Sequence, residues 1–220
     1  MDPQELITRY KQLKKHKRLS RGNSKLAACV GIFNLPAVHS CLNCKDCLDS
    51  CYARQAQIQY PNVREFRNAN YHLAKVSPEV LTELLLAQID SEKIRIVRIH
   101  ESGDFFSADY LKLWYNIAIQ RPHVMFYSYT KVIHLFEGEF ELLNTLPNVN
   151  IINSFIDGHR NYGSGEYVAS LINTYGCFLC PGEGCMSACT HCLTKDNVVF
   201  QIHGTLKTKD TYKEKIYENV

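Results

Sequence analysis

Nine of the ten cysteines fall into two short groups, and this clustering constrains the fold more than any other feature of the chain. The first group has the spacing C-x2-C-x2-C-x3-C, and the second has the spacing C-x2-C-x4-C-x3-C-x2-C. Their members are Cys41, Cys44, Cys47 and Cys51, and then Cys177, Cys180, Cys185, Cys189 and Cys192. Thiols this close in sequence converge on a soft metal at little cost in chain entropy. We therefore expect both groups to bind metal.

The rest of the chain indicates a reducing compartment. The N-terminal segment lacks the apolar stretch of a signal peptide, and no apolar run reaches the roughly 20 residues that span a bilayer. We therefore expect a cytoplasmic protein without a membrane partner. Cysteines stay reduced in the cytoplasm, so a dense set of them favours metal binding or catalysis over disulfides. The remaining cysteine, Cys29, lies in an apolar run and is expected to be a buried structural thiol.

Three interpretations of the cysteine groups remain open. The spacing of the first group equals that of bacterial ferredoxins, in which the fourth cysteine binds a different cluster. Pairs of C-x2-C are also typical of four-cysteine zinc sites, and a redox or disulfide system is the third interpretation. Zinc ribbons separate their pairs by a hairpin, whereas overlapping short spacings wrap a compact cubane. One or two 4Fe-4S clusters are therefore favoured, with zinc as the alternative metal.

Hydrophobic periodicity predicts strands alternating with helices along most of the chain. The predicted strands span residues 26–34, 94–100, 124–129, 149–155 and 198–203. The predicted helices span residues 2–20, 52–60, 79–89, 108–120, 140–146 and 166–175. This rhythm indicates βαβ units, and five strands are too few for a closed eight-stranded barrel. The prediction is an α/β fold: a partial (open) β/α barrel with a mostly parallel sheet and cysteine-rich metal-binding loops. Residues 1–21 are expected to form a basic helical N-terminal extension, and residues 22–220 a single domain.

Polar residues follow the predicted strand ends, where α/β folds gather their functional groups. The first cysteine group follows the strand over 26–34. Six further residues at strand ends are candidate cofactor-binding residues: Glu101, Ser102, Gly103, Asp104, Tyr129 and Lys131. For Asp104, as for Ser107, capping of the next helix is the alternative role. His100 is either a ligand or base, or a satisfied strand-end histidine.

The N-terminal part of the chain is strongly basic. No acidic residue occurs between Glu5 and Asp46, and nine lysines and arginines do: Arg9, Lys11, Lys14, Lys15, Lys17, Arg18, Arg21, Lys25 and Lys45. Such a run suits contact with nucleic acid, and the alternative is a solvated surface. Nucleic acid is therefore a candidate partner of this segment.

Several stretches resemble a family of phage and prophage proteins named after gene product eighty-eight. They are GNSK at 22–25, FNLPAVHSC at 33–41, the segment from Cys47 to Ala53, SGDFF at 102–106 and FYSYTK at 126–131. The resemblance covers most of residues 22–200 and implies a phage or mobile-element origin.

A more distant resemblance is to radical S-adenosylmethionine (SAM) enzymes. In that superfamily a cysteine loop follows the first strand and holds a 4Fe-4S cluster, and a glycine-rich acidic motif follows the second strand and holds SAM. The order of the first cysteine group and residues 101–104 is similar. The superfamily's C-x3-C-x2-C spacing is absent from the first group, however, and occurs instead at Cys185, Cys189 and Cys192.

Together these features predict an iron–sulfur enzyme of radical-SAM-like type. Its substrate is unknown, and nucleic acid or a nucleotide is a candidate. The alternative is a non-catalytic, metal-stabilised protein that binds nucleic acid or a host protein. No G-x-S-x-G, H-E-x-x-H or Walker pattern is present, which argues against a serine hydrolase, a zinc protease or a P-loop NTPase. The sequence leaves the oligomeric state open.

Overall fold

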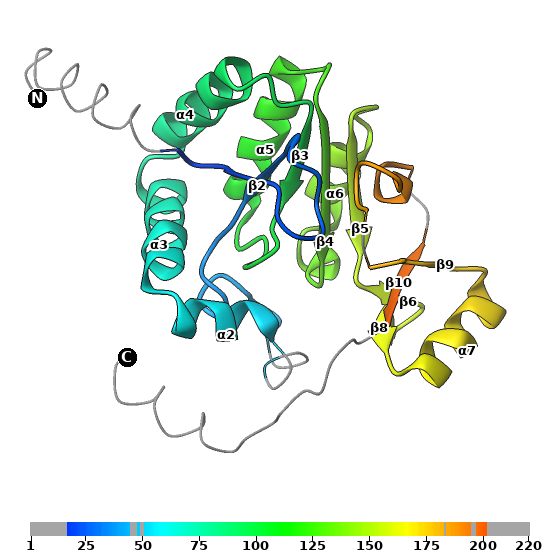
Figure 1. The fold of residues 1–220 in the computed structure, drawn as a ribbon. Coiled ribbons are helices and arrows are strands. Elements are labelled where there is room, and N and C mark those ends of the chain that lie inside the picture. Colours follow the sequence, from blue (N-terminus) through cyan, green and yellow to red (C-terminus); the bar gives the residue numbers. More distant parts are fainter. Residues whose placement is uncertain (1–16, 45–47, 49–50, 183, 195–196, 202–220) are drawn as a thin grey trace, which may run out of the picture.

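The computed structural model describes residues 17–44, 48, 51–182, 184–194 and 197–201 (Figure 1). Its elements are, in chain order, β1 Ser20–Arg21, β2 Val30–Phe33, α2 Tyr52–Gln59, α3 Pro61–Val76, α4 Pro78–Ser91, β3 Ile96–Ile99, α5 Ala108–Gln120, β4 Met125–Thr130, η2 Ile133–Leu135, α6 Glu137–Asn144, β5 Val149–Asn153, β6 Phe155–Ile156, β7 His159–Arg160, β8 Tyr162–Gly163, α7 Gly165–Tyr175, β9 Phe178–Leu179, η3 His191–Leu193 and β10 Val198–Gln201.

The main sheet has five strands in the order β1-β2-β3-β4-β5. Strands β2 to β5 are parallel to one another, and β1 runs antiparallel to β2. Spatial neighbours are therefore sequence neighbours, and helices make each parallel connection. Within the described residues β1 and β5 lie at the two edges, so the sheet is open. The expected α/β class with a mostly parallel sheet is confirmed.

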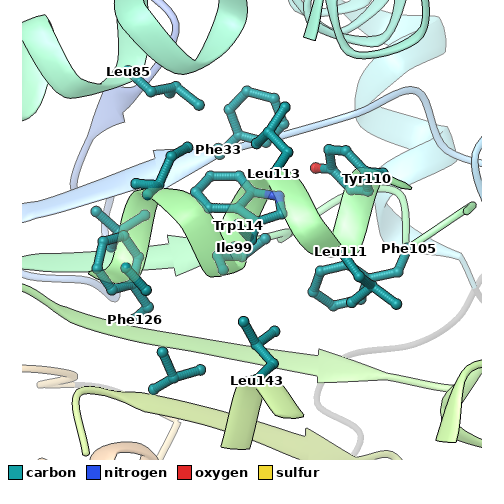
Figure 2. Packing of buried hydrophobic residues seen from close by; sticks show 14 of the residues in the cluster. Phe33, Leu85, Ile99, Phe105, Tyr110, Leu111, Leu113, Trp114, Phe126 and Leu143 are labelled. Atoms are coloured by element: carbon teal, nitrogen blue, oxygen red, sulfur yellow. The ribbon is translucent and has the colours of Figure 1, made fainter. Parts of the chain in front are cut away.

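One face of the sheet packs against helices α3 to α6 and holds the larger hydrophobic core. Trp114 of α5 lies at its centre, with its ring centroid 5.2 Å from that of Phe33 on β2 and 6.4 Å from that of Phe126 on β4 (Figure 2). Helix α5 begins where predicted because the Ser107 hydroxyl accepts a hydrogen bond from the Tyr110 N–H at 3.2 Å. We call this side of the sheet the helix face.

The opposite side carries the alternate residues of the same strands, because neighbouring side chains on a strand point to opposite faces. Val30, Ile32 and Tyr127 form a second buried cluster there with Leu26 and Met186. Partly buried Ile96, Tyr129, Cys185, Cys192 and Leu193 pack against this cluster. We call this side the cysteine face, since residues 184–194 of the second cysteine group cover part of it.

The C-terminal part of the described chain forms a smaller unit beside β5 (Figure 1). Strand β10 lies between β8 and β9 and is parallel to both. Helix α7 packs on these strands through Val168 and Leu171, which contact Val199 and Cys177 in a separate hydrophobic cluster. The predicted strand over 198–203 therefore forms, but it belongs to this small sheet and not to the main one.

Two predictions near the N-terminus need correction. Most of the predicted helix over 2–20 lies outside the described residues, but its C-terminal end is wrong, because Ser20–Arg21 pair with β2 as a strand. Leu19 is 1% exposed, so residues just before Gly22 already belong to the packed domain. Cys29 is exposed and not buried. It lies in a turn before β2, because the strand begins only at Val30 and does not extend back to Leu26.

The other helices match their predicted positions to within a few residues, but α3 was not predicted. In the described part of the chain, no helix is both long enough and apolar enough to cross a membrane.

Candidate metal centre

The second cysteine group is fixed to the cysteine face by backbone hydrogen bonds. The Cys185 N–H donates to the Lys25 carbonyl at 3.0 Å, and the Ala27 N–H donates to the Cys185 carbonyl at 3.0 Å. The Asn150 side chain on β5 donates to the Cys192 carbonyl at 2.8 Å. One end of the segment from Cys185 to Cys192 is thus held by the loop before β2, and the other end is held by β5.

Four of its thiols lie close enough for their charges to interact. Burial raises the pKa of Cys185, and the nearby Cys180, Cys192 and Cys189 thiolates raise it further. Burial likewise raises the pKa of Cys192, with Cys180 and Cys189 adding to the effect. The Cys185 and Cys192 thiols are therefore protonated at neutral pH, and metal binding would have to release their protons.

Cys177 is placed apart from these four cysteines. It is 5% exposed and lies in the hydrophobic cluster of α7 and β10. Burial is the cause that raises the pKa of its thiol. The structure thus brings together four of the five cysteines of this group.

Metal geometry is not preformed in the described residues. Among them, no three histidine, cysteine, aspartate or glutamate side chains meet in an arrangement that could hold a metal ion. The four thiols would have to move toward one another on binding.

Tyr129 is the candidate residue with the most direct contact to a cysteine. Its hydroxyl lies 2.9 Å from the Cys192 sulfur. Burial, together with the Cys192 and Cys180 charges, raises the pKa of Tyr129. The phenol therefore keeps its proton and can donate a hydrogen bond to a Cys192 thiolate.

Arg98 occupies the centre of the cysteine face and was not among the predicted site residues. It lies in register with Tyr127 on β4, and its guanidinium carbon is 6.0 Å from the centroid of the Tyr127 ring. One guanidinium nitrogen is 3.4 Å from the Glu101 carboxylate. Arg98 lowers the pKa of Cys185 and Cys192, against the larger opposing effect of burial. A permanent positive charge therefore lies near the thiols.

The segment 101–104 ties the carboxyl ends of three strands together. The Asn34 side chain, after β2, accepts hydrogen bonds from the Glu101 and Ser102 N–H groups at 2.8 and 2.9 Å. The Ser102 hydroxyl donates to the Leu35 carbonyl at 2.8 Å. Gly103 has φ +83°, and a Cβ there would lie 2.5 Å from the Ser40 hydroxyl, so only glycine fits.

Asp104 joins this segment to β4. Its Oδ1 accepts from the Thr130 hydroxyl at 2.6 Å and from the Phe105 N–H at 2.8 Å, and its Oδ2 accepts from the Lys131 N–H at 3.1 Å. Burial raises its pKa, and these hydrogen bonds oppose that rise. Both oxygens are engaged within the chain, which makes Asp104 a positioning residue for the strand ends.

The first cysteine group lies at this same end of the sheet, beyond β2. Cys41, Cys44 and Cys51 are half-buried, whereas Cys47 lies outside the described residues. Cys51 is the residue that precedes α2, and the adjacent Tyr52 donates its hydroxyl to the Glu101 carbonyl at 2.6 Å. Since Glu101 also contacts Arg98, residues 51, 52, 101 and 98 form a chain of neighbours from the first group to the cysteine face.

The remaining candidates are dispersed. His100 faces the helix side, where its Nε2 lies 2.8 Å from the Tyr110 hydroxyl, and burial lowers its pKa to about 3. His100 is therefore a neutral core residue, and its hydrogen bond and ring contacts are to helix-face residues and not to cysteines. Lys131 lies over the Tyr162 ring, with its nitrogen 5.6 Å from the centroid. Lys17 and Arg21 of the basic segment pair with Glu92 at 3.2 and 3.5 Å.

Strand periodicity could have identified Arg98 and Asn150 as candidate site residues from the sequence. In the run IRIVRIH, Ile96 and Arg98 are two residues apart and share one face, so a cation stands where an apolar residue is expected. Asn150 likewise interrupts an apolar strand. A polar side chain on a covered sheet face needs a partner: Asn150 has the Cys192 carbonyl, and Arg98 has the Glu101 carboxylate.

Comparison with protein families matches residues 5–176 to the family described as Gene product 88. The chain belongs to the gene product 88 family. It is also 30% identical over 121 residues to the Gene 88 protein of Mycobacterium phage L5, an alignment that covers 48% of this chain and 50% of the relative. The chain thus spans about half the length of that curated relative. No solved structure matches the chain. The resemblance to this phage family is confirmed.

Proposed function

We propose that this member of the gene product 88 family binds an iron–sulfur cluster through Cys180, Cys185, Cys189 and Cys192 on the cysteine face of its sheet. The observation that carries the proposal is the environment of Cys192, whose sulfur lies 2.9 Å from the Tyr129 hydroxyl. The other three thiols of the set lie within electrostatic range of it or of Cys185.

The surroundings of these thiols suit a buried anionic sulfur centre. Thiolates are the ligands that hold iron–sulfur clusters, and four of them around a metal carry a net negative charge. Removing that charge from water is unfavourable unless donors and positive charge surround it. Arg98 supplies the positive charge, and Tyr129 supplies a donor. Cluster binding would draw the four thiols together and release the protons of Cys185 and Cys192.

Iron–sulfur is proposed over zinc because of the first cysteine group. Its overlapping spacing, C-x2-C-x2-C-x3-C, is that of a ferredoxin run and is poorly suited to a zinc ribbon. Cys41, Cys44 and Cys51 lie at the carboxyl end of the sheet, where a second cluster would be near Tyr52 and Glu101. Zinc remains the alternative metal that the test below distinguishes.

We extend the proposal to radical-SAM-like catalysis on a partial β/α barrel. The sequential parallel strands with helices on one face are the arrangement that such a barrel requires. Cys185, Cys189 and Cys192 have the C-x3-C-x2-C spacing, and cleavage of SAM requires an iron without a cysteine ligand. In that case Cys180 would be dispensable for cluster binding. Residues 101–104, Tyr129 and Lys131 remain the proposed SAM-binding set, with Glu101 and Lys131 carrying the charges that a SAM amine and carboxylate would meet.

The test is reconstitution of the reduced protein with iron and sulfide under anaerobic conditions. The proposal expects a brown protein. The colour should be strongly reduced in Cys185→Ala and Cys192→Ala, down to that of any second cluster in the first cysteine group, and kept in the control Cys29→Ala, since Cys29 is exposed in a turn. A colourless protein that binds zinc through the same cysteines would contradict it. Retention of the cluster in Cys180→Ala, with 5′-deoxyadenosine formed from SAM and dithionite, would support the catalytic extension; cluster loss in that variant without SAM cleavage would refute it.

A further inference from the structure

Two buried hydrogen-bonding atoms on the cysteine face have no partner. They are the Arg98 Nε and the Tyr127 hydroxyl oxygen. In the described part of the chain, the other buried side-chain atoms without a partner are the Arg67 Nε, the His100 Nδ1 and the Trp114 Nε1. His100 and Trp114 belong to the helix face, away from the cysteines. Arg67, on α3, lies near Cys51 of the first cysteine group and donates to the Ala53 carbonyl.

The two unpaired atoms come from neighbouring strands and point to the same side. Arg98 and Tyr127 are paired in the parallel register of β3 and β4. Tyr127 is 1% exposed and lies in the cluster that contains Met186, with Cys185 and Cys192 packed against it. Both residues lie close enough to these thiols for their charges to interact: Cys192 and Cys185 raise the pKa of Tyr127, after the larger effect of burial.

Buried donors are normally satisfied, so two unsatisfied ones on the same face of the sheet point to a bound group that would accept hydrogen bonds from them. The group must accept hydrogen bonds, since Arg has donors alone and a phenol donates readily. An anionic group suits this position, because Arg98 is permanently charged and its ion pair with Glu101 engages a different guanidinium nitrogen from Nε. A metal centre with thiolate and sulfide ligands meets both requirements.

We propose that the Arg98 Nε–H and the Tyr127 O–H, together with the Tyr129 hydroxyl, form a donor set for the sulfur atoms of the centre held by the second cysteine group. This inference rests on the proposed function and deepens it. Arg98 and Tyr127 are positioning residues: they contact sulfur and not substrate. Hydrogen bonds to sulfur and nearby positive charge stabilise a cluster and raise its reduction potential.

Tyr127→Phe is the sharpest test, because it removes one oxygen atom that has no partner in the metal-free protein. The stability of the metal-free protein should therefore be unchanged or higher, measured by urea unfolding. The cluster of the same variant should be lost faster to a chelator, by roughly 10- to 100-fold, as for other residues that support metal ligands. These two effects have opposite signs, which a general packing defect would not produce.

Tyr110→Phe is the matched control, since the Tyr110 hydroxyl is also buried but lies 2.8 Å from His100 on the helix face. This variant should destabilise the metal-free protein and leave the rate of cluster loss within twofold of the wild type. A Tyr127→Phe protein that loses its cluster no faster than the wild type would overturn the inference.

Arg98 is tested through the reduction potential. Arg98→Gln removes the charge and should lower the equilibrium constant for one-electron reduction by about tenfold, which corresponds to about 59 mV. Arg98→Lys keeps the charge and should show the smaller shift. Equal potentials in all three proteins would contradict the proposal. If the wild type acquires no cluster at all, the proposed function itself fails; if it acquires one that Tyr127→Phe and Arg98→Gln leave unaltered, only this inference fails.

Discussion

His100 makes the stability of the metal-free protein depend on pH in a defined direction. Its side chain is 4% exposed, and burial lowers its pKa from 6.5 to about 3. Between these values the unfolded chain binds a proton at His100 and the folded chain does not. The contribution of His100 to the free energy of unfolding is therefore fully present above pH 6.5, and it is lost as the pH decreases toward 3.

The size of the effect follows from the shift. Each pH unit below 6.5 costs about 1.4 kcal/mol while the folded state remains unprotonated, so the loss reaches about 2 kcal/mol at pH 5. Domains are typically stable by only about 5–15 kcal/mol, so this is a substantial fraction. The imidazole ring is surrounded by the rings of Phe33, Phe105 and Tyr110. None of these side chains carries a negative charge that would offset the burial of the protonated form.

The assay is urea unfolding of the reduced, metal-free protein between pH 7.5 and pH 5. His100→Gln carries no titrating group, so the wild type should lose about 2 kcal/mol relative to this variant over that range. His72→Gln is the control, because His72 lies exposed on α3. The difference in the free energy of unfolding between His72→Gln and the wild type should be the same at each pH. A gap between the wild type and His100→Gln that does not change with pH would refute the reasoning.

Three further variants, with Gly158→Ala as the control for the first, test the framework of the site and its set of cysteines. Gly103→Ala should lower the free energy of unfolding by roughly 2–4 kcal/mol, because the left-handed backbone is strained and the added carbon lies 2.5 Å from a buried hydroxyl. Gly158→Ala, also left-handed but in open space, should cost only about 1 kcal/mol in the same urea titration; equal losses would exclude the steric argument. Asp104→Asn should cost roughly 1–3 kcal/mol, because the amide NH2 must face one of three hydrogen-bond donors, and an unchanged unfolding midpoint would argue against its positioning role. Cys177→Ala should leave the iron content unaltered, because this thiol packs in the cluster of α7; loss of iron would place Cys177 among the ligands.

The strand and helix pattern of this chain was readable because its periodicity is strong. Helix α5 was predicted at its observed bounds, since an apolar stripe and the Ser107 cap mark both its face and its start. Helix α3 was missed because its apolar residues are sparse, and its three buried residues, Arg67, Asn70 and Ala74, do not stand out as hydrophobic. Asn70 is buried because its side chain donates to the Arg18 and Asn34 carbonyls at 3.1 Å.

Part of the candidate site could also be predicted from sequence patterns. Cysteine spacing and strand ends identify the right segments, and Tyr129 does contact a cysteine. The roles of Ser102 and Asp104 depend on partners far along the chain, which spacing does not reveal: Leu35 for Ser102 and Thr130 for Asp104. Arg98 was missed because it lies inside a strand, where a cation looks like an interruption of the pattern until the covering segment is known.

Whether the second cysteine group holds iron and sulfide can be decided from the iron, sulfide and zinc content of the protein purified without oxygen, together with its visible spectrum. We expect iron and sulfide in comparable amounts and absorption near roughly 400 nm from thiolate-bound clusters, both strongly reduced in Cys192→Ala. Zinc without sulfide, or iron that Cys192→Ala fully retains, would contradict the proposal.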